Sequence, residues 1–324
     1  MRGYNMKRIF LLFIVTISLF TISACDSINL PSFDLDIGSK DDENNDNNTN
    51  DDSSNLDEED KINLSFEGYY SVLNGNLDTD FEEKLHQLTE SKHTTKGSYS
   101  KAWTILQAAD EDPNNSNNVI CLYTGLSLPK SDRDGSSSSS IVWNREHVWP
   151  KSLGFSKESY PAHNDCHHLH ATEKIINSTR GNKNFGEVNN PTNTDSYGNK
   201  WNSLYFEPRD EVKGDVARSI FYMVIRYDGD VCNDCKLDLQ IIDGAAELRH
   251  STDNVVGKIG DLNTLLKWHY EDPVSEVEMK RNEVVYSYQG NRNPFIDHEE
   301  FVSYLYTSLV SSYTDISKFE YLID

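Results

Sequence analysis

The sequence has few basic residues for its length. Its 324 residues include 30 lysines and arginines against 53 aspartates and glutamates, which gives a formal net charge of −23 at pH 7. A protein that holds nucleic acid over a broad surface needs a basic face that neutralises many phosphates. The charge balance therefore excludes a broad electrostatic interface of that kind. Any contact with nucleic acid must be confined to a local basic cleft.

The N-terminal apolar run is too short for a membrane span. Lys7 and Arg8 precede this run over 9–22, which falls short of the roughly 20 residues that a spanning helix requires. Small residues follow, and the segment ends in Ile-Ser-Ala-Cys at Cys25. The pattern is typical of an export signal, and its end resembles a bacterial lipobox, with Cys25 as the lipidated residue. A plain signal peptide with an incidental cysteine is the alternative. We predict a lipoprotein signal peptide over 1–25 and a mature protein that is secreted or held on the extracellular face of the cell membrane by this anchor alone.

Apolar residues are nearly absent from the next segment. Between Asp41 and Asp60 the only one is Leu56, and the stretch has ten acidic residues and no basic one. Such a composition buries too little apolar surface to offset the entropy of ordering. We therefore expect a disordered acidic tether over 26–62 and one globular domain over 63–324. Calcium binding by the acidic run is the alternative, but the run lacks the glycine of an EF-hand loop.

Cysteine is scarce after residue 25, where only Cys121, Cys166, Cys232 and Cys235 remain. Export permits disulfides, and Cys232-Asn-Asp-Cys235 has the spacing of a local disulfide or of half a zinc site. No second Cys-x-x-Cys or spaced histidine pair stands nearby to complete a structural zinc site. A local disulfide or a pair of thiols is the favoured interpretation.

Histidine, in contrast, is concentrated in one segment. Five of the ten histidines, at positions 147, 163, 167, 168 and 170, fall within 24 positions. The alternating residues over 140–148 predict a strand that ends at Pro150, and a second short strand is expected around 167–170. Residues 171–177 predict a helix with Thr172 as the candidate N-cap, stopping near Gly181. The segment therefore predicts a strand, a strand and a helix in succession.

Three further helices are predicted towards the C-terminus. Over 216–227 an apolar stripe places Val216, Ile220, Met223 and Val224 on one face, and two more helices are expected over 261–270 and 276–286.

This arrangement brings together groups suited to phosphodiester hydrolysis. Glu146 and His147 are on the first strand, and Asn177 is on the helix. A neutral histidine takes a proton from water near physiological pH, and carboxylate and amide oxygens are hard ligands that suit Mg²⁺ or Ca²⁺. Because neighbouring residues of a strand point to opposite faces, Glu146 and His147 share a cleft only near a bend, a bulge or a strand end.

The motifs resemble those of the bacterial endonuclease I family of secreted nucleases, which belongs to the ββα-metal (His-Me finger) superfamily. The resemblance rests on Asn-Arg-Glu-His-Val-Trp-Pro over 144–150, on His-His-Leu and on Asn-Ser-Thr-Arg-Gly-Asn over 177–182, and it extends to segments 99–125, 213–222, 268–274 and 289–295. It implies an α+β catalytic domain over 63–324, in which long helices flank a short central sheet. By the same likeness His147 is the general base, and Glu146 and Asn177 bind Mg²⁺, with Mn²⁺ or Ca²⁺ as alternatives. The implied activity is endonucleolytic hydrolysis of DNA, RNA or both without strong sequence preference, and we expect a monomer.

One feature of the family is missing. Some members carry a transition-state arginine in a cysteine-rich insert between the two strands, whereas the interval 151–164 here contains no arginine. Arg145, Arg180 and Arg218 are the candidates to replace it. Arg180 ranks first because it lies one turn from Asn177.

Other residues have both structural and functional interpretations. We expect His168 to orient the site through a backbone hydrogen bond, and Asp165 either to fix a histidine tautomer or to cap a turn. Trp143 and Trp149 are expected in the core. Segment 289–294 is expected to brace the domain, whereas Arg281 and Arg292 either contact phosphate or pack on loops.

Two other functions fit parts of the sequence. A metal-scavenging lipoprotein would need three or four converging ligands, usually for zinc, and a surface adhesin would leave the Glu-His and Asn set unexplained. The sequence therefore favours the nuclease.

Overall fold

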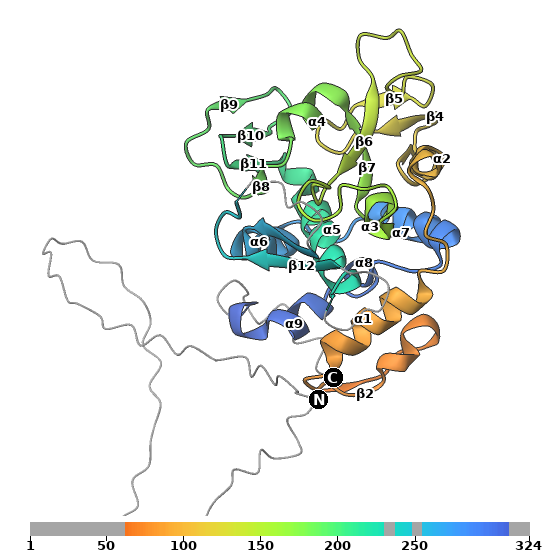
Figure 1. The fold of residues 1–324 in the computed structure, drawn as a ribbon, viewed down its shortest axis with the longest axis vertical. Coiled ribbons are helices and arrows are strands. Elements are labelled where there is room, and N and C mark those ends of the chain that lie inside the picture. The colour runs from red at the N-terminus through yellow and green to blue at the C-terminus, as the bar shows by residue number, and fades with distance from the viewer. Residues whose placement is uncertain (1–61, 230–236, 248–254, 311–324) are drawn as a thin grey trace, which may run out of the picture. The chain divides into compact units, whose positions relative to one another are not determined.

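The apolar stripe predicted over 216–227 forms the central helix of the computed structural model. Helix α5 (Lys213–Arg226) buries most of its residues, among them Val216, Ile220 and Met223. It packs against α1 (Phe81–Lys92), α6 (Leu262–Glu271) and strand β12 (Leu237–Ile242). Figure 1 shows α5 running through the middle of the domain, with the other elements around it.

The structure describes residues 62–229, 237–247 and 255–310, and all of them belong to one compact unit. The predicted signal peptide with Cys25, the tether up to residue 61, and the Cys232 and Cys235 pair lie outside the described residues. Inside them, no helix combines the length and the apolar character that crossing a membrane demands.

The helical half of the domain follows local sequence signals. The helices predicted over 261–270 and 276–286 are confirmed as α6 and α7 (Glu276–Gln289). Asp261 caps α6, and Ser275 caps α7 in a reciprocal capping box with Glu278. The remaining helices of the described residues are α2 (Tyr99–Ala109), α3 (Pro161–Asn164), α4 (Lys174–Arg180), α8 (Pro294–Asp297), α9 (Phe301–Val310) and the 3₁₀ helices η2 (Gly68–Leu73) and η3 (Asp210–Val212).

The strands form several small sheets in place of the single central sheet that was predicted. The sheet orders are β1-β2, β3-β4-β5, β6-β7, β8-β11-β10-β9 and β12-β13. Besides β12, the strands are β1 (Asn63–Leu64), β2 (Gly75–Asn76), β3 (Glu111–Asp112), β4 (Asn115–Ile120), β5 (Ser127–Pro129), β6 (Trp143–His147), β7 (Leu169–Glu173), β8 (Asn184–Phe185), β9 (Asn193–Thr194), β10 (Lys200–Trp201), β11 (Tyr205–Glu207) and β13 (Val255–Gly260). The mixed α+β class is confirmed, and the central sheet is not.

The outer edge of β6 explains why no larger sheet forms there. The carbonyls of Arg145 and His147 accept hydrogen bonds from side chains of α4. The backbone groups of Trp143 bond to the loop at Asp132 and Asp134. Because these partners satisfy the edge, no further strand is required to pair with it.

The predicted succession of strand, strand and helix is present as β6, β7 and α4. The two strands pair antiparallel in an unbroken register from Trp143 opposite Glu173 to His147 opposite Leu169. The predicted N-cap is wrong, because Thr172 is still paired in β7 and Glu173 caps α4 through bonds from Ile175 N and Ile176 N. The helix ends before Gly181, whose positive φ of 59° suits glycine.

Two apolar cores enclose this hairpin. Trp149 lies in the larger core around α5, and Trp143 lies in a smaller one with α2 and part of α7. Both side chains are fully buried, as predicted. In Figure 1 the hairpin lies between α2 and α4, so its two faces meet different helices.

Candidate active site

Glu146 lies buried on the face of β6 that meets α4. Its Oε1 accepts hydrogen bonds from the Tyr123 hydroxyl at 2.7 Å and from Arg180 Nη1 at 2.9 Å. Burial raises the pKa of Glu146 to about 6, against the opposing effects of Arg180 and Tyr123. Both of these side-chain bonds go to Oε1, so Oε2 has no side-chain partner among the described residues, although the backbone N–H of His147 also stabilises the carboxylate.

Arg180 is buried behind this carboxylate. Besides Glu146, its guanidinium donates to the carbonyl of His147 at 2.7 Å and to that of Val148 at 2.5 Å. Its guanidinium lies 4.3 Å from the centre of the Phe185 ring, and its side chain is 1% exposed. The Nη atoms thus bind groups of the protein itself, an arrangement that orients Glu146 and the end of β6.

Asn177 faces the same strand one turn earlier on α4. Its Nδ2 donates to Asn144 Oδ1 at 2.8 Å and to the carbonyl of Arg145 at 3.3 Å. These bonds fix the amide, and Oδ1 accepts no hydrogen bond from any residue that the structure describes. Residues 177 and 180 lie three apart and therefore on one side of the helix. The carboxylate of Glu146 and the amide of Asn177 are consequently held by the same surface of α4.

The two free oxygens fit a hard divalent cation. A carboxylate oxygen and an amide oxygen are the donor types that Mg²⁺ and Ca²⁺ prefer, and a site with few protein ligands keeps positions for water and substrate. In the part of the chain that the structure describes, no three His, Cys, Asp or Glu side chains form a cluster that could hold a metal ion.

His147 is the last residue of β6 and points to the opposite face. Its Nε2 lies 3.0 Å from the carbonyl oxygen of His163, which can only accept, so Nε2 carries the proton. The lone pair of the neutral ring is then on Nδ1. Burial lowers the pKa of His147 well below its usual value, and the nearby His168 and His163 lower it further. The imidazole is therefore held in its basic form.

Two further predicted residues support the segment that orients His147. His168 Nε2 donates to the carbonyl of Ala162 at 2.8 Å, one residue before the carbonyl that His147 binds. His168 is thus tied to α3 through a backbone bond, the type of contact expected for it.

Asp165 is fully buried and caps a turn. Its Oδ1 accepts from His167 N at 3.0 Å, and its Oδ2 accepts from the Tyr222 hydroxyl at 2.7 Å. Burial opposes ionisation of this carboxyl, but His93, His167 and the hydrogen bonds outweigh burial and lower the pKa of Asp165. The contacts agree with the turn-capping interpretation.

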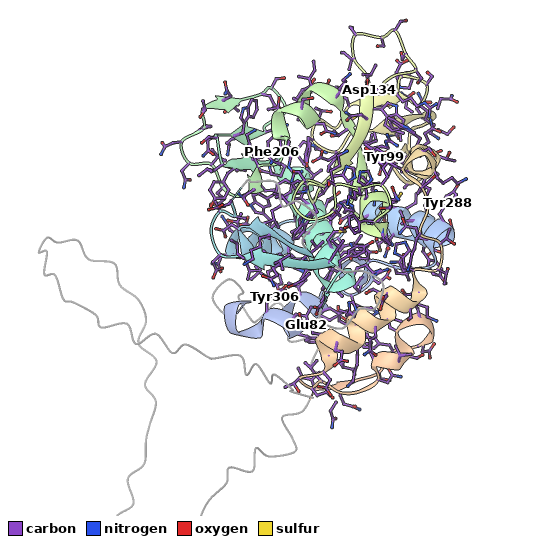
Figure 2. All side chains as sticks on the ribbon, viewed as in Figure 1. Glu82, Tyr99, Asp134, Phe206, Tyr288 and Tyr306 are labelled. Carbon is purple, nitrogen blue, oxygen red and sulfur yellow. The ribbon has the colours of Figure 1, made fainter. Side chains whose placement is uncertain are left out.

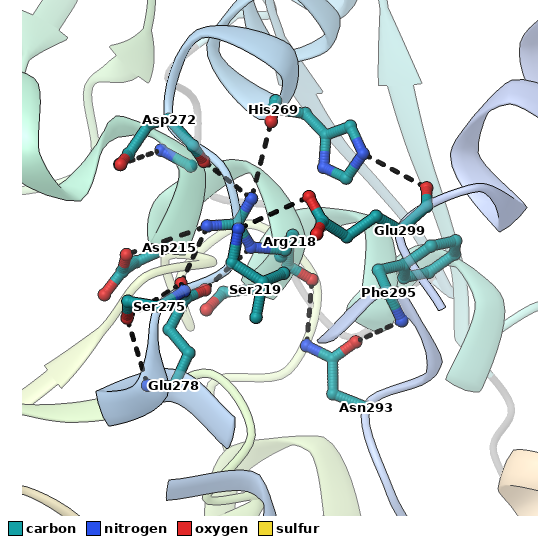
Figure 3. A network of polar contacts seen from close by, with 12 residues as sticks. Asp215, Arg218, Ser219, His269, Asp272, Ser275, Glu278, Asn293, Phe295 and Glu299 are labelled. Carbon is teal, nitrogen blue, oxygen red and sulfur yellow. Dashed lines mark hydrogen bonds and ion pairs between the residues drawn. The ribbon is translucent and has the colours of Figure 1, made fainter. Parts of the chain in front are cut away.

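The other candidate arginines have different surroundings. Arg218 is fully buried and forms a bidentate pair with Glu278 at 2.7 and 2.8 Å, and it donates to the carbonyl of Asp272 at 2.8 Å. Figure 3 shows this network, which joins α5 to α7. Arg281 pairs with Asp110 at 2.7 Å and Arg292 with Asp297 at 2.6 Å, so both serve packing.

Arg145 is different, because it lies against aromatic rings on the same face as His147. Its guanidinium carbon is 3.3 Å from the centre of the Tyr99 ring and 4.2 Å from that of Trp103. Tyr99, at the start of α2, is labelled in Figure 2.

Gln289 braces the domain as predicted. Its Oε1 accepts from Cys166 N at 2.6 Å, and its Nε2 donates to Asp165 at 2.9 Å. Cys166 and Cys121 are buried free thiols whose pKa burial raises. Neither cysteine takes part in the site around Glu146.

Tyr123 and Tyr99 were not singled out from the sequence. Tyr123 precedes Glu146 by 23 residues and reaches it only through the tertiary fold. The one available signal was that both tyrosines lie in segment 99–125, which shares the family resemblance.

Comparisons with known proteins show the family of the chain. The sequence model of the Endonuclease I family matches residues 78–300. An extracellular ribonuclease of Bacillus amyloliquefaciens is 45% identical over 240 residues, which is 72% of this chain and 76% of that protein. An extracellular ribonuclease of Bacillus subtilis (strain 168) is 43% identical over 235 residues, again 72% of this chain and 76% of that protein. The chain belongs to the endonuclease I family and is a nuclease, a hydrolase of nucleic acid.

Proposed function

We propose that the protein is an exported, cation-dependent endonuclease whose catalytic core is β6, β7 and α4, a ββα-metal (His-Me finger) unit. The observation that carries this proposal is the fixed tautomer of His147. A backbone carbonyl holds Nε2, and the basic Nδ1 remains for substrate chemistry. Glu146 and Asn177, which would supply the oxygen ligands, are both side chains at the contact between α4 and β6.

In this proposal His147 acts as the general base. Its Nδ1 accepts a proton from a water molecule, whose oxygen attacks the phosphorus while the bond to the leaving oxygen breaks. A positioned base of this kind contributes about 10² to 10⁴ in rate. Because Glu146 and His147 emerge on opposite faces, a phosphate that reaches both must lie at the end of β6.

Glu146 and Asn177 would hold the cation, with Mg²⁺ proposed and Mn²⁺ or Ca²⁺ as alternatives. When bound, a divalent cation neutralises the charge that develops on the phosphate and the leaving oxygen. Arg180 and Tyr123 fix the Glu146 carboxylate through Oε1, so that Oε2 keeps one direction. We therefore assign Arg180 to positioning, in place of the phosphate contact that the sequence suggested.

RNA is the proposed principal substrate, because both relatives are named ribonucleases, and DNA remains a second substrate. Contacts through phosphate carry no base information, so we propose cleavage without strong sequence preference. The names of the relatives also support export of this chain. We propose that it is anchored through Cys25 and acts as a monomer.

The test is an activity panel with the purified protein. Plasmid DNA and a structured RNA are incubated with Mg²⁺, Mn²⁺, Ca²⁺ or EDTA. We expect cleavage of RNA with a divalent cation, none in EDTA, and scattered cut sites. Cleavage that persists in EDTA would contradict the role of Glu146 and Asn177. RNA that remains intact under every condition would contradict the proposal that RNA is the substrate.

A further inference from the structure

The arginines around the candidate site divide into two kinds. Arg180 and Arg218 are buried against glutamates, each with a carboxylate oxygen less than 3 Å away. Arg145 is half-buried, and no carboxylate of the described residues lies within 4.0 Å of it. The chain has 53 acidic residues, yet none of the described ones pairs with Arg145. The positive charge of Arg145 is therefore not neutralised by an ion pair and can attract an anionic ligand.

Aromatic rings and a backbone carbonyl fix the orientation of Arg145. The guanidinium lies over Tyr99 and Trp103, and Nη1 donates to the carbonyl of Tyr99. Stacking of this type stabilises a planar cation without consuming its N–H donors. Nε is buried and has no hydrogen-bond partner among the described residues, and none of these residues bonds to Nη2 either. The planar group is thus preset while donors stay unused.

Arg145 is placed beside the proposed base. Residues 145 and 147 are two apart on β6, so their side chains share a face. The same Tyr99 ring lies 5.5 Å from the centre of the His147 ring. Arg145 and the imidazole are therefore neighbours on one surface.

Other cations make this surface locally positive. Lys151 Nζ lies 5.5 Å from the centre of the Tyr99 ring, and the Arg133 guanidinium lies 5.4 Å from that of Trp103. Burial lowers the pKa of Arg145, and Glu158 opposes this shift although it forms no ion pair with Arg145. This patch is the local basic surface that the acidic composition requires of a nucleic-acid enzyme.

We propose that Arg145 binds the scissile phosphate and stabilises the charge that develops on it, with Tyr99 and Trp103 holding the guanidinium in place. The proposal rests on the nuclease function argued above. A guanidinium donates two parallel hydrogen bonds to phosphate oxygens, and these bonds strengthen as negative charge accumulates. Arg145 thereby takes the transition-state role for which Arg180 and Arg218 are too deeply engaged.

The experiment compares Arg145→Ala, Arg145→Lys and Arg209→Ala in the full chain. Arg209 is a matched control, because it is also half-buried and donates to one backbone carbonyl, that of Leu122, but has Glu211 as its ion-pair partner. kcat and KM are measured on an RNA oligonucleotide with saturating Mg²⁺. Each measurement is repeated with guanidinium chloride and with sodium chloride at the same ionic strength.

For Arg145→Ala we expect kcat to fall on the order of 10²-fold or more, the usual cost of one charge-stabilising donor. Guanidinium, but not sodium, should recover at least about tenfold of this loss by occupying the cavity over Tyr99. Arg145→Lys keeps the charge but lacks the planar guanidinium with its paired donors, so its kcat should lie between that of Arg145→Ala and that of the wild type. Arg209→Ala should match the wild type and show no response to guanidinium.

Three outcomes would overturn the proposal: kcat of Arg145→Ala within twofold of wild type, a loss that guanidinium does not reverse, or an equal response in Arg209→Ala. If Arg145→Ala fails to fold, Arg145→Lys provides the test. A wild-type kcat in Arg145→Lys would show that the paired donors of the guanidinium are not needed and would overturn the proposal. His147→Ala is assayed in parallel. If His147→Ala cleaves like the wild type, the nuclease mechanism itself fails. If His147→Ala is inactive while Arg145→Ala is active, only the role of Arg145 fails.

Discussion

Replacing Arg180 with methionine distinguishes a positioning role from contact with substrate. The variant keeps much of the side-chain volume but removes the charge and all donors. The side chains of Arg180 and Glu146 are 1% and 2% exposed, so solvent does not screen their interaction and the energies typical of buried ion pairs apply. Removing one partner of such a pair costs about 3–5 kcal/mol. The carbonyls of His147 and Val148 also lose their donor, at about 1–3 kcal/mol for each group left without a partner.

We therefore expect the free energy of unfolding of Arg180→Met to fall by at least about 4 kcal/mol, a large share of the roughly 5–15 kcal/mol that stabilises a domain. Urea unfolding followed by tryptophan fluorescence and by circular dichroism measures this difference. Arg180→Lys can donate to one of the three acceptors, which are Glu146 and the carbonyls of His147 and Val148. Its free energy of unfolding should therefore lie between those of Arg180→Met and the wild type. A methionine variant with wild-type stability but greatly reduced kcat would refute the positioning role and return Arg180 to the phosphate.

Three further results are expected. In the proposed cation site Asn177→Ala leaves Glu146 as the remaining protein ligand, so the Mg²⁺ concentration for half-maximal cleavage should rise about tenfold or more. An unchanged half-saturation would exclude Asn177 as a ligand. Burial lowers the pKa values of His93, His167 and His168 to about 4. The unfolded chain takes up these protons near pH 6.5, whereas the folded chain does not. The free energy of unfolding should therefore fall from pH 6.5 towards pH 4, by up to about 1.4 kcal/mol per pH unit for each histidine. A melting temperature that does not change over this pH range would contradict this expectation. The logarithm of affinity for duplex DNA should fall with the logarithm of salt at a slope of about −2 to −4, since few phosphates are neutralised, and a slope approaching −10 in titrations with inactive protein would indicate a broad basic interface.

Local signals predicted the parts of the fold that depend on neighbours in sequence. The apolar stripe of α5 and the glycine after α4 act within a few residues, so the sequence displays them. The N-cap of α4 was misplaced by one residue, because pairing of Thr172 with Asn144 across the hairpin outweighed its local preference. The absence of a central sheet depends on side chains that satisfy the edge of β6, and no pattern in β6 itself reveals them.

The candidate site divides in the same way. The residue types at 146, 147 and 177 indicate their chemistry, and the fold brings 146 and 177 to one surface of α4. The environment of an arginine is not visible in sequence, since only the fold places aromatic rings beside Arg145 and a carboxylate and two carbonyls beside Arg180. The hydroxyl of Tyr123 on Glu146 likewise depends on a contact between distant segments.

The measurement that tests the central claim most directly is the cleavage rate of His147→Ala on RNA with saturating Mg²⁺. His298→Ala serves as the control, because His298 is a half-buried histidine that pairs with Glu300 outside the site. We expect the His147 variant to remain folded and to lose about 10² to 10⁴ in kcat, whereas the His298 variant keeps the wild-type rate. A folded His147→Ala protein that retains more than about a tenth of the wild-type rate would contradict the assignment of His147 as the base.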